Sequence, residues 1–248
     1  PSIVLILLGD IIGVSVGELF IGATIPGLIL VALFLIYSFA FCHFKKDMQI
    51  TKASDDLAPK EIILTLVSAL LPPAILIISV LGSIFMGIAS PTEAASVGAF
   101  GAIVLAFCNK KLNLKILKEA MQTTTNLTCM VFMILMGATL FSLVFRELGG
   151  DDAIRDIVLS LPHGEMGFIA LVMLLLFVLG CFLDIIEIIF IIVPILVPIL
   201  KIFNLDPLWF AILIAINLQT SFLTPPLGFS LFYLKGVAPP EVRSEDIY

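Results

Sequence analysis

The chain has 248 residues, of which 60% are hydrophobic and only 13% are charged. A water-soluble domain carries about 25% charged residues, because it needs a polar shell. The composition therefore excludes a soluble enzyme, a nucleic-acid-binding protein, a secreted disulfide-linked domain and a disordered chain. It is typical of a helical protein that crosses the lipid bilayer several times.

Uncharged apolar segments recur along the whole chain. About 20 apolar residues suffice to cross the hydrocarbon core of a bilayer. We therefore expect an all-α, polytopic membrane protein. Six uncharged segments have 16 or more residues: 19–42, 62–92, 94–109, 120–145, 166–183 and 207–234.

Residue types that usually build enzymes and metal centres are sparse. The four cysteines lie in or beside apolar segments without CxxC spacing, so we interpret them as reduced thiols. Neither His43 nor His163 belongs to a metal-ligand motif. A membrane-embedded enzyme would need a nucleophile–base pair or a metal cluster at membrane depth, and the sequence contains no such set.

The basic residues are distributed unevenly between the polar connections. Ten of the 13 Lys and Arg residues lie in 43–61, 108–119 and 235–248. The positive-inside rule places these connections in the cytoplasm. The acidic connection 146–165 is then external, and segment 167–203 must enter and leave the membrane on the outer side.

Segment 167–203 can satisfy this orientation as two full crossings or as one re-entrant hairpin. Each arm has about 17 residues, which is short for a tilted span. We favour the hairpin, because non-helical backbone at membrane depth is tolerated where protein covers it or water fills a cavity. Gly180, Asp184 and Glu187 lie at its expected tip. Ionisable residues inside a membrane mark candidate sites, and the alternative is that both acids are merely solvated.

Segment 208–234 contains a polar interruption before two consecutive prolines. Pro225 and Pro226 each remove a backbone donor and disfavour a helical residue before them. A simple kink would not account for the polar residues that precede the prolines. We therefore expect two half-helices with an unwound polar centre, as in transporter binding sites. The polar residues are Asn217, Gln219, Thr220, Ser221 and Thr224.

A second interruption precedes segment 94–107. Ser90 or Thr92 can cap the helix that follows, with Pro91 in its first turn. Glu93 suits the positive end of the helix dipole. A gating or ion-binding role for Ser90, Thr92 and Glu93 is the alternative, and the sequence leaves both interpretations open.

The two ends of the chain show a faint internal repeat. Residues 1–9 and 226–236 each begin with a proline and continue as a short apolar half-helix that ends at a glycine. The orientation above makes the two units run in opposite directions, which is typical of inverted-repeat transporters. We expect a fragment of a longer protein in which 1–60 ends the first repeat with a half-helix, a connecting helix and a cytoplasmic loop. The second repeat is then 61–248, with scaffold helices 62–145, the hairpin 167–203, the broken helix 208–234 and a truncated tail.

Three motifs resemble the large membrane subunit of tripartite ATP-independent periplasmic (TRAP) transporters. They occur in the order expected of that family, and the resemblance covers essentially the whole chain as the C-terminal part of a longer subunit. Two departures are Ser221, where the family often has glycine, and Glu187, where it has a small residue. The motifs are Ser90-Pro-Thr-Glu-Ala-Ala95, Gly180-Cys-Phe-Leu-Asp184 followed by Pro194-Ile-Leu-Val-Pro-Ile199, and Leu223-Thr-Pro-Pro-Leu-Gly228.

The resemblance implies an elevator-type permease in the bacterial inner membrane that takes up small organic anions, such as C4-dicarboxylates, with sodium as the coupling ion. It also implies two protein partners, a periplasmic substrate-binding protein and a small membrane subunit. The alternative is a divalent-anion or citrate-type sodium symporter that needs no binding protein. A purely structural or assembly subunit would not need a polar helix break beside an acidic hairpin tip.

Sodium and a substrate carboxylate are expected where the hairpin tip meets the broken helix. Sodium prefers oxygen ligands, which unwound carbonyls and the C-terminal ends of half-helices supply. Apart from sodium we expect no metal and no cofactor. Ser2 is assigned to a first-repeat sodium site. The other predicted sodium and substrate residues are Gly180, Asp184, Asn217, Thr220, Ser221, Thr224 and Pro225.

Overall fold

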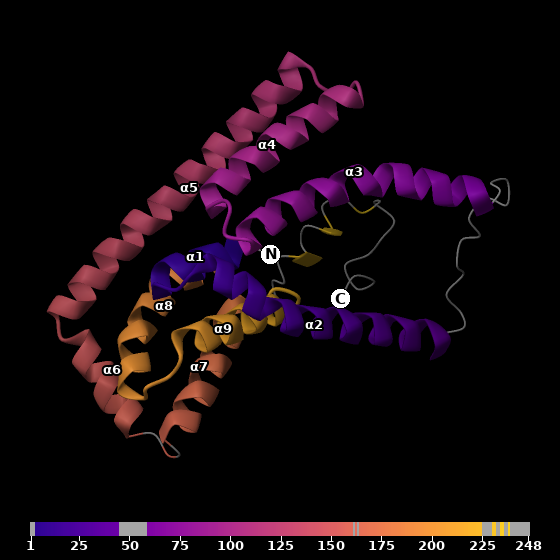
Figure 1. Cartoon of the computed structure of the whole chain (residues 1–248). Coiled ribbons are helices and arrows are strands. Elements are labelled where there is room, and N and C mark those ends of the chain that lie inside the picture. The colour runs from indigo at the N-terminus through magenta and orange to yellow at the C-terminus, as the bar shows by residue number, and fades with distance from the viewer. Residues whose placement is uncertain are drawn as a thin grey trace. The chain divides into compact units, whose positions relative to one another are not determined.

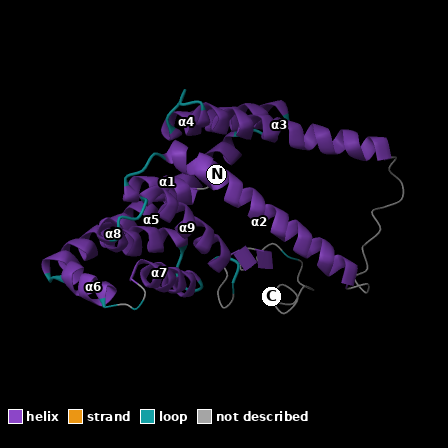
Figure 2. Cartoon of the chain, turned by 60° about the horizontal axis from the view of Figure 1, so that its bottom comes forward, coloured by secondary structure: helices purple, strands orange, loops and turns teal. Residues whose placement is uncertain are grey.

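The computed structural model describes residues 3–44, 59–160, 162 and 164–224, together with single residues and pairs between 230 and 238. For residues 59–65 and 68 it describes the backbone alone. Two predicted site residues, Ser2 and Pro225, lie outside the described residues. Within the described part of the chain, helices and their connections account for the whole structure, without a strand (Figure 2).

The described residues form nine helices (Figure 1). Four of them, α2, α4, α5 and α8, are long and apolar enough to cross a membrane, and α6 with α7 forms a bent pair that passes the same test. The chain is therefore an all-α polytopic membrane protein, as the sequence predicts. The helices are α1 (Ile3–Ile12), α2 (Val16–Phe44), α3 (Pro59–Phe85), α4 (Pro91–Cys108), α5 (Leu114–Glu147), α6 (Gly150–Leu159), α7 (Gly164–Gly180), α8 (Ile185–Ile202) and α9 (Pro207–Ser221).

The chain divides into two compact units, and the smaller comprises Ala23–Met121. Within it, α3 packs against α4. Gly101 of α4 lies against the side chain of Leu76, and a Cβ on Gly98 would lie 3.3 Å from Val80 Cγ2. Small residues at such positions let two membrane helices approach closely, which increases their van der Waals contact.

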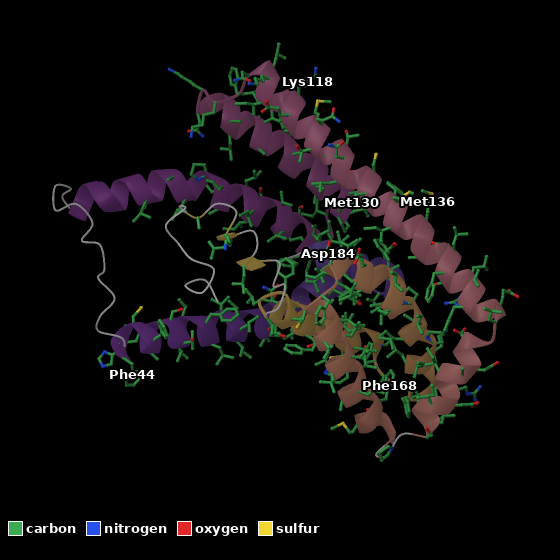
Figure 3. The ribbon with its side chains drawn as sticks, turned by 180° about the vertical axis from the view of Figure 1, so that it is seen from behind. Phe44, Lys118, Met130, Met136, Phe168 and Asp184 are labelled. Carbon is green, nitrogen blue, oxygen red and sulfur yellow. The ribbon has the colours of Figure 1, made fainter. Side chains whose placement is uncertain are left out.

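The larger unit comprises Pro1–Gly22 and Gln122–Tyr248, and it contains all the buried hydrophobic residues of the described part except Ala94. In this core α1 packs on α8 and α9, while α7 packs on α9. Phe168 of α7 is fully buried and stacks on Phe203 and Phe210, with ring centroids 5.4 and 6.1 Å apart. Phe168 lies near the start of α7, at the open base of the predicted hairpin. Asp184 lies at the start of α8, at the tip of the hairpin (Figure 3).

Two helices differ from the segments expected from hydropathy. The connection 146–165 contains α6, a ten-residue amphipathic helix. Helix α5 has 34 residues and begins at Leu114, well before the apolar segment 120–145. Asn113 starts it by accepting a hydrogen bond from Ile116 N at 2.8 Å. At 1.5 Å per residue, α5 is about 51 Å long, which exceeds the apolar thickness of a bilayer.

The two-repeat organisation and the re-entrant path stay predictions. Helix α1 coincides with the expected first half-helix. Much of its counterpart, 226–236, lies outside the described residues. Helix α8 is also long enough to cross a membrane alone.

Candidate ion and substrate site

The predicted hairpin tip is the short connection 181–184 between α7 and α8. Leu179 O accepts hydrogen bonds from Phe182 N at 2.9 Å and from Leu183 N at 2.8 Å. The Cys181 thiol donates to Phe177 O at 3.3 Å. These bonds satisfy carbonyl groups that the last turn of a helix otherwise leaves unpaired, so the chain reverses without a long loop.

Asp184 forms the N-cap of α8. Its Oδ1 accepts a hydrogen bond from Ile185 N at 2.7 Å, and its side chain is half-buried. Glu187 follows in the first turn and is also half-buried. Both carboxylates therefore lie at the positive end of the α8 dipole, which stabilises negative charge. The N-cap to N3 spacing of these two acids, typical of helix starts, is a sequence signal that our interpretation of them missed.

The polar residues at the end of α9 direct their hydroxyl protons back to their own helix. Thr220 Oγ1 donates to Asn217 O at 2.7 Å, Ser221 Oγ to Leu218 O at 2.9 Å, and Thr224 Oγ1 to Thr220 O at 2.9 Å. A hydroxyl that donates its proton in this way retains lone pairs and acts only as an acceptor. With their protons directed to these carbonyls, the hydroxyl oxygens are suited to ligate a cation.

The end of α7 lies directly against the end of α9. Ser221 is fully buried, and a Cβ built on Gly180 would overlap Ser221 Oγ and lie 2.8 Å from Ser221 Cβ. Glycine is therefore the residue type that this contact accommodates. The structure thus brings Gly180 and Ser221 together, as the predicted site requires.

One side-chain hydrogen bond joins α7 to α9 further from the tip. Asn217 Nδ2 donates to Met173 O at 2.7 Å. Along the interface, residues 168, 173 and 180 of α7 meet residues 210, 217 and 221 of α9 in the same order. The two helices are therefore parallel, and their C-terminal ends lie side by side.

This parallel arrangement sets the electrostatics of the junction. The C-terminal end of a helix carries about half a negative elementary charge. Two such ends meet here, next to the half-buried hydroxyls of Thr220 and Thr224. Among the described side chains, no group of three or more His, Cys, Asp or Glu residues could hold a metal ion. Oxygen ligands at the junction come from the Thr220 and Thr224 hydroxyls and from backbone carbonyls, the ligand type that hard cations prefer.

Ser90, Thr92 and Glu93 belong to the smaller unit and form the start of α4. Ser90 Oγ accepts from Glu93 N at 3.4 Å, and Glu93 Oε2 accepts from Ser90 N at 2.8 Å. This reciprocal pair is a capping box, with Ser90 rather than Thr92 as the N-cap residue. The structure thus contains the helix cap that is one of the two interpretations of this motif. The gating or ion-binding role stays a prediction.

Comparison with known proteins gives matches along the whole chain. Residues 1–248 match the family model described as the DctM component of tripartite ATP-independent periplasmic transporters. The chain is 30% identical, over 96% of its length, to the sialic acid TRAP transporter large permease protein SiaM of Vibrio cholerae, of which it covers 55%. It is 29% identical, over 96% of its length, to the C4-dicarboxylate TRAP transporter large permease protein DctM of Pseudomonas aeruginosa, of which it covers 55%. It is 30% identical, over 94% of its length, to the ectoine TRAP transporter large permease protein TeaC of Halomonas elongata, of which it covers 53%. The chain thus spans about half the length of these relatives.

Proposed function

Because the chain belongs to the DctM family of TRAP transporter components, we propose that it forms part of a large permease subunit for sodium-coupled uptake of organic acids. Its relatives are named as permease proteins, so the chain is a membrane transport protein and not an enzyme. The family match favours this function over a symporter that works without a binding protein. The partners that we propose are a periplasmic substrate-binding protein and a small membrane subunit, in the bacterial inner membrane.

The observation that carries the proposal is the meeting of two helix C-termini at Gly180 and Ser221. In a low-dielectric membrane interior, two partial negative charges side by side attract a cation strongly. Sodium is a hard monovalent cation whose ligands are oxygens. We assign Thr220 Oγ1 and Thr224 Oγ1 as ligands, because both hydroxyls are half-buried and have lone pairs available. Ser221 Oγ packs against Gly180, so Ser221 closes the contact instead of ligating the ion.

We propose an organic acid as the substrate, from the names of the relatives and from the charges at the ends of α7, α8 and α9. The three relatives are named for sialic acid, C4-dicarboxylates and ectoine, which carry a carboxylate, and a further relative is named for isethionate, a sulfonate. In the structure the hydroxyls of α9 donate to carbonyls of their own helix, and Asp184 caps the positive end of α8. A bound sodium ion would therefore supply the positive charge that the substrate needs. Coupling then arises because the anion binds well only after the cation has bound.

In the elevator mechanism that we propose, the hairpin and α9 carry the sodium ion and the substrate across the membrane together.

The test is a sodium titration of uptake by the complete transporter complex in liposomes. Thr224→Ala removes one proposed ligand, and we expect the half-saturating sodium concentration to rise about tenfold, which corresponds to about 1.4 kcal/mol. Thr224→Ser keeps the hydroxyl and should remain near the wild type. Thr139→Ala is a matched control, because Thr139 Oγ1 donates to Leu135 O at 2.7 Å in the same i−4 pattern on α5. An unchanged sodium titration for Thr224→Ala would rule out the assigned ligand set.

A further inference from the structure

We propose that Asn217 is a positioning residue that locks α9 to α7 and so holds the Thr220 and Thr224 oxygens at the hairpin tip. This inference rests on the proposed sodium site and adds the element that sets its geometry. The sequence predicts a sodium-binding or substrate-binding role for Asn217. In the structure its amide instead donates to Met173 O at 2.7 Å, across the interface between the two helices.

The chemistry of the amide group supports a structural link over a ligand role for Asn217 Nδ2. An amide nitrogen can only donate, so Nδ2 cannot ligate a cation. Its partner is a carbonyl in the middle of α7, seven residues before the tip glycine Gly180. Such side-chain to backbone bonds are the polar contacts that hold membrane helices together.

The same residue continues the link into the proposed site. Asn217 O accepts the proton of Thr220 Oγ1, and Thr220 O accepts the proton of Thr224 Oγ1. These bonds run in series from Met173 in α7 to Thr224 beyond the end of α9. A shift of Asn217 relative to Met173 would therefore move both proposed ligands relative to the tip.

The remaining contacts between α7 and α9 restrict this register less sharply. The stacked rings of Phe168 and Phe210 pack against each other, but an apolar contact has no required direction. The Gly180–Ser221 contact limits only how closely the helices approach. The Asn217 bond joins one donor to one acceptor, so it restricts both translation and rotation of α9 against α7.

The deciding variant is Asn217→Leu, which keeps the number and branching of the side-chain heavy atoms and removes the donor. The matched control is Gln122→Leu, because Gln122 Nε2 donates to Asn126 Oδ1 at 3.1 Å on the exposed surface of α5. Both are measured in the complete complex by sodium-dependent uptake and by amide hydrogen exchange. We expect Asn217→Leu to raise the half-saturating sodium concentration about fivefold, the effect of losing one interhelical hydrogen bond of usual strength. Exchange in 170–180 and 214–221 should accelerate by a similar factor, and Gln122→Leu should change neither quantity.

Each outcome bears on the inference. Unchanged exchange would overturn it, because α7 and α9 would then stay locked without Asn217. Faster exchange with an unchanged sodium titration would also overturn it, because Asn217 would then stabilise the fold without positioning the ligands. A wrong assignment of the sodium site would be recognised from Thr224→Ala, which would then leave the sodium titration unchanged. That result does not depend on the effect of Asn217→Leu on hydrogen exchange.

Discussion

Ser221 is the buried polar residue of the described core, and its hydroxyl is satisfied within its own helix turn. A buried hydroxyl without a partner would be costly, and the bond to Leu218 O removes that cost. The helix can therefore present a small, fully packed surface to Gly180. At this position the size of the side chain matters as much as its chemistry.

Replacement of Gly180 by alanine tests this contact. The added Cβ would overlap Ser221, so we expect Gly180→Ala to destabilise the complex by about 1–3 kcal/mol, the usual cost of overpacking. Thermal unfolding of the purified complex measures the effect. Adding Ser221→Gly should restore most of the lost stability, because it removes the atoms that clash.

A matched control for that experiment lies on α5. A Cβ on Gly137 would meet nothing within 4 Å, so Gly137→Ala should be neutral or slightly stabilising. If Gly180→Ala unfolds at the wild-type temperature, the ends of α7 and α9 are not in the close contact described above.

At the scale of the helix, the start of α4 depends on one capping residue. Ser90→Ala removes the acceptor for Glu93 N, and the usual cost of losing such a cap is about 1 kcal/mol. We therefore expect faster hydrogen exchange in the first turn of α4. Thr92→Ala is the control, because Ser90 and not Thr92 occupies the N-cap position. Equal effects of the two substitutions would contradict the cap assignment.

Most helices could be predicted from hydropathy, and the exceptions have a common cause. The apolar segments 62–92 and 166–183 correspond to α3 and α7 within a few residues at most ends. Hydropathy predicts only a polar connection where α6 lies, because the acidic residues of α6 conceal the helical period that leaves Val158 buried. Helix α5 continues through the polar stretch around Gln122, which a search for apolar residues does not detect.

The composition of the candidate site could also be predicted, whereas its internal partners could not. Polar residues before Pro225 and a glycine at position 180 are visible in the sequence as interruptions of apolar segments. The bond from Asn217 to Met173 is not visible, because Met173 contributes a backbone carbonyl that every residue possesses. The three-dimensional placement of α7 beside α9 is needed to identify that carbonyl.

At the scale of the whole molecule, the charge distribution predicts which connections face the cytoplasm. Lys111 lies between α4 and α5 in a basic connection, and Asp152 lies in the acidic helix α6. In a background without native cysteines, Lys111→Cys should resist a membrane-impermeant thiol reagent added to whole cells. Asp152→Cys should react with it. The opposite labelling pattern would contradict the orientation derived from the positive-inside rule.

The surface of the chain is consistent with immersion in lipid. Large apolar side chains along α2 are mostly exposed. The exposed fractions of Ile25, Leu35 and Phe39 are 70%, 66% and 79%. Such a surface would cause aggregation in water, whereas a bilayer solvates it favourably. Bulk hydrophobicity therefore locates the protein in the membrane, while the few polar residues at the ends of α7 and α9 locate its candidate site.

The parallel packing of α7 and α9 also has a consequence for ion valence. Two helix ends of about half a charge each amount to about one negative elementary charge. A monovalent cation would cancel that charge, so the junction would no longer repel a substrate carboxylate, which could then bind the cation directly. A divalent cation would leave an excess positive charge in a low-dielectric interior, where uncompensated charge is costly. On the charge of the two helix ends alone, the proposed site would thus favour ions of single charge over Mg²⁺ or Ca²⁺.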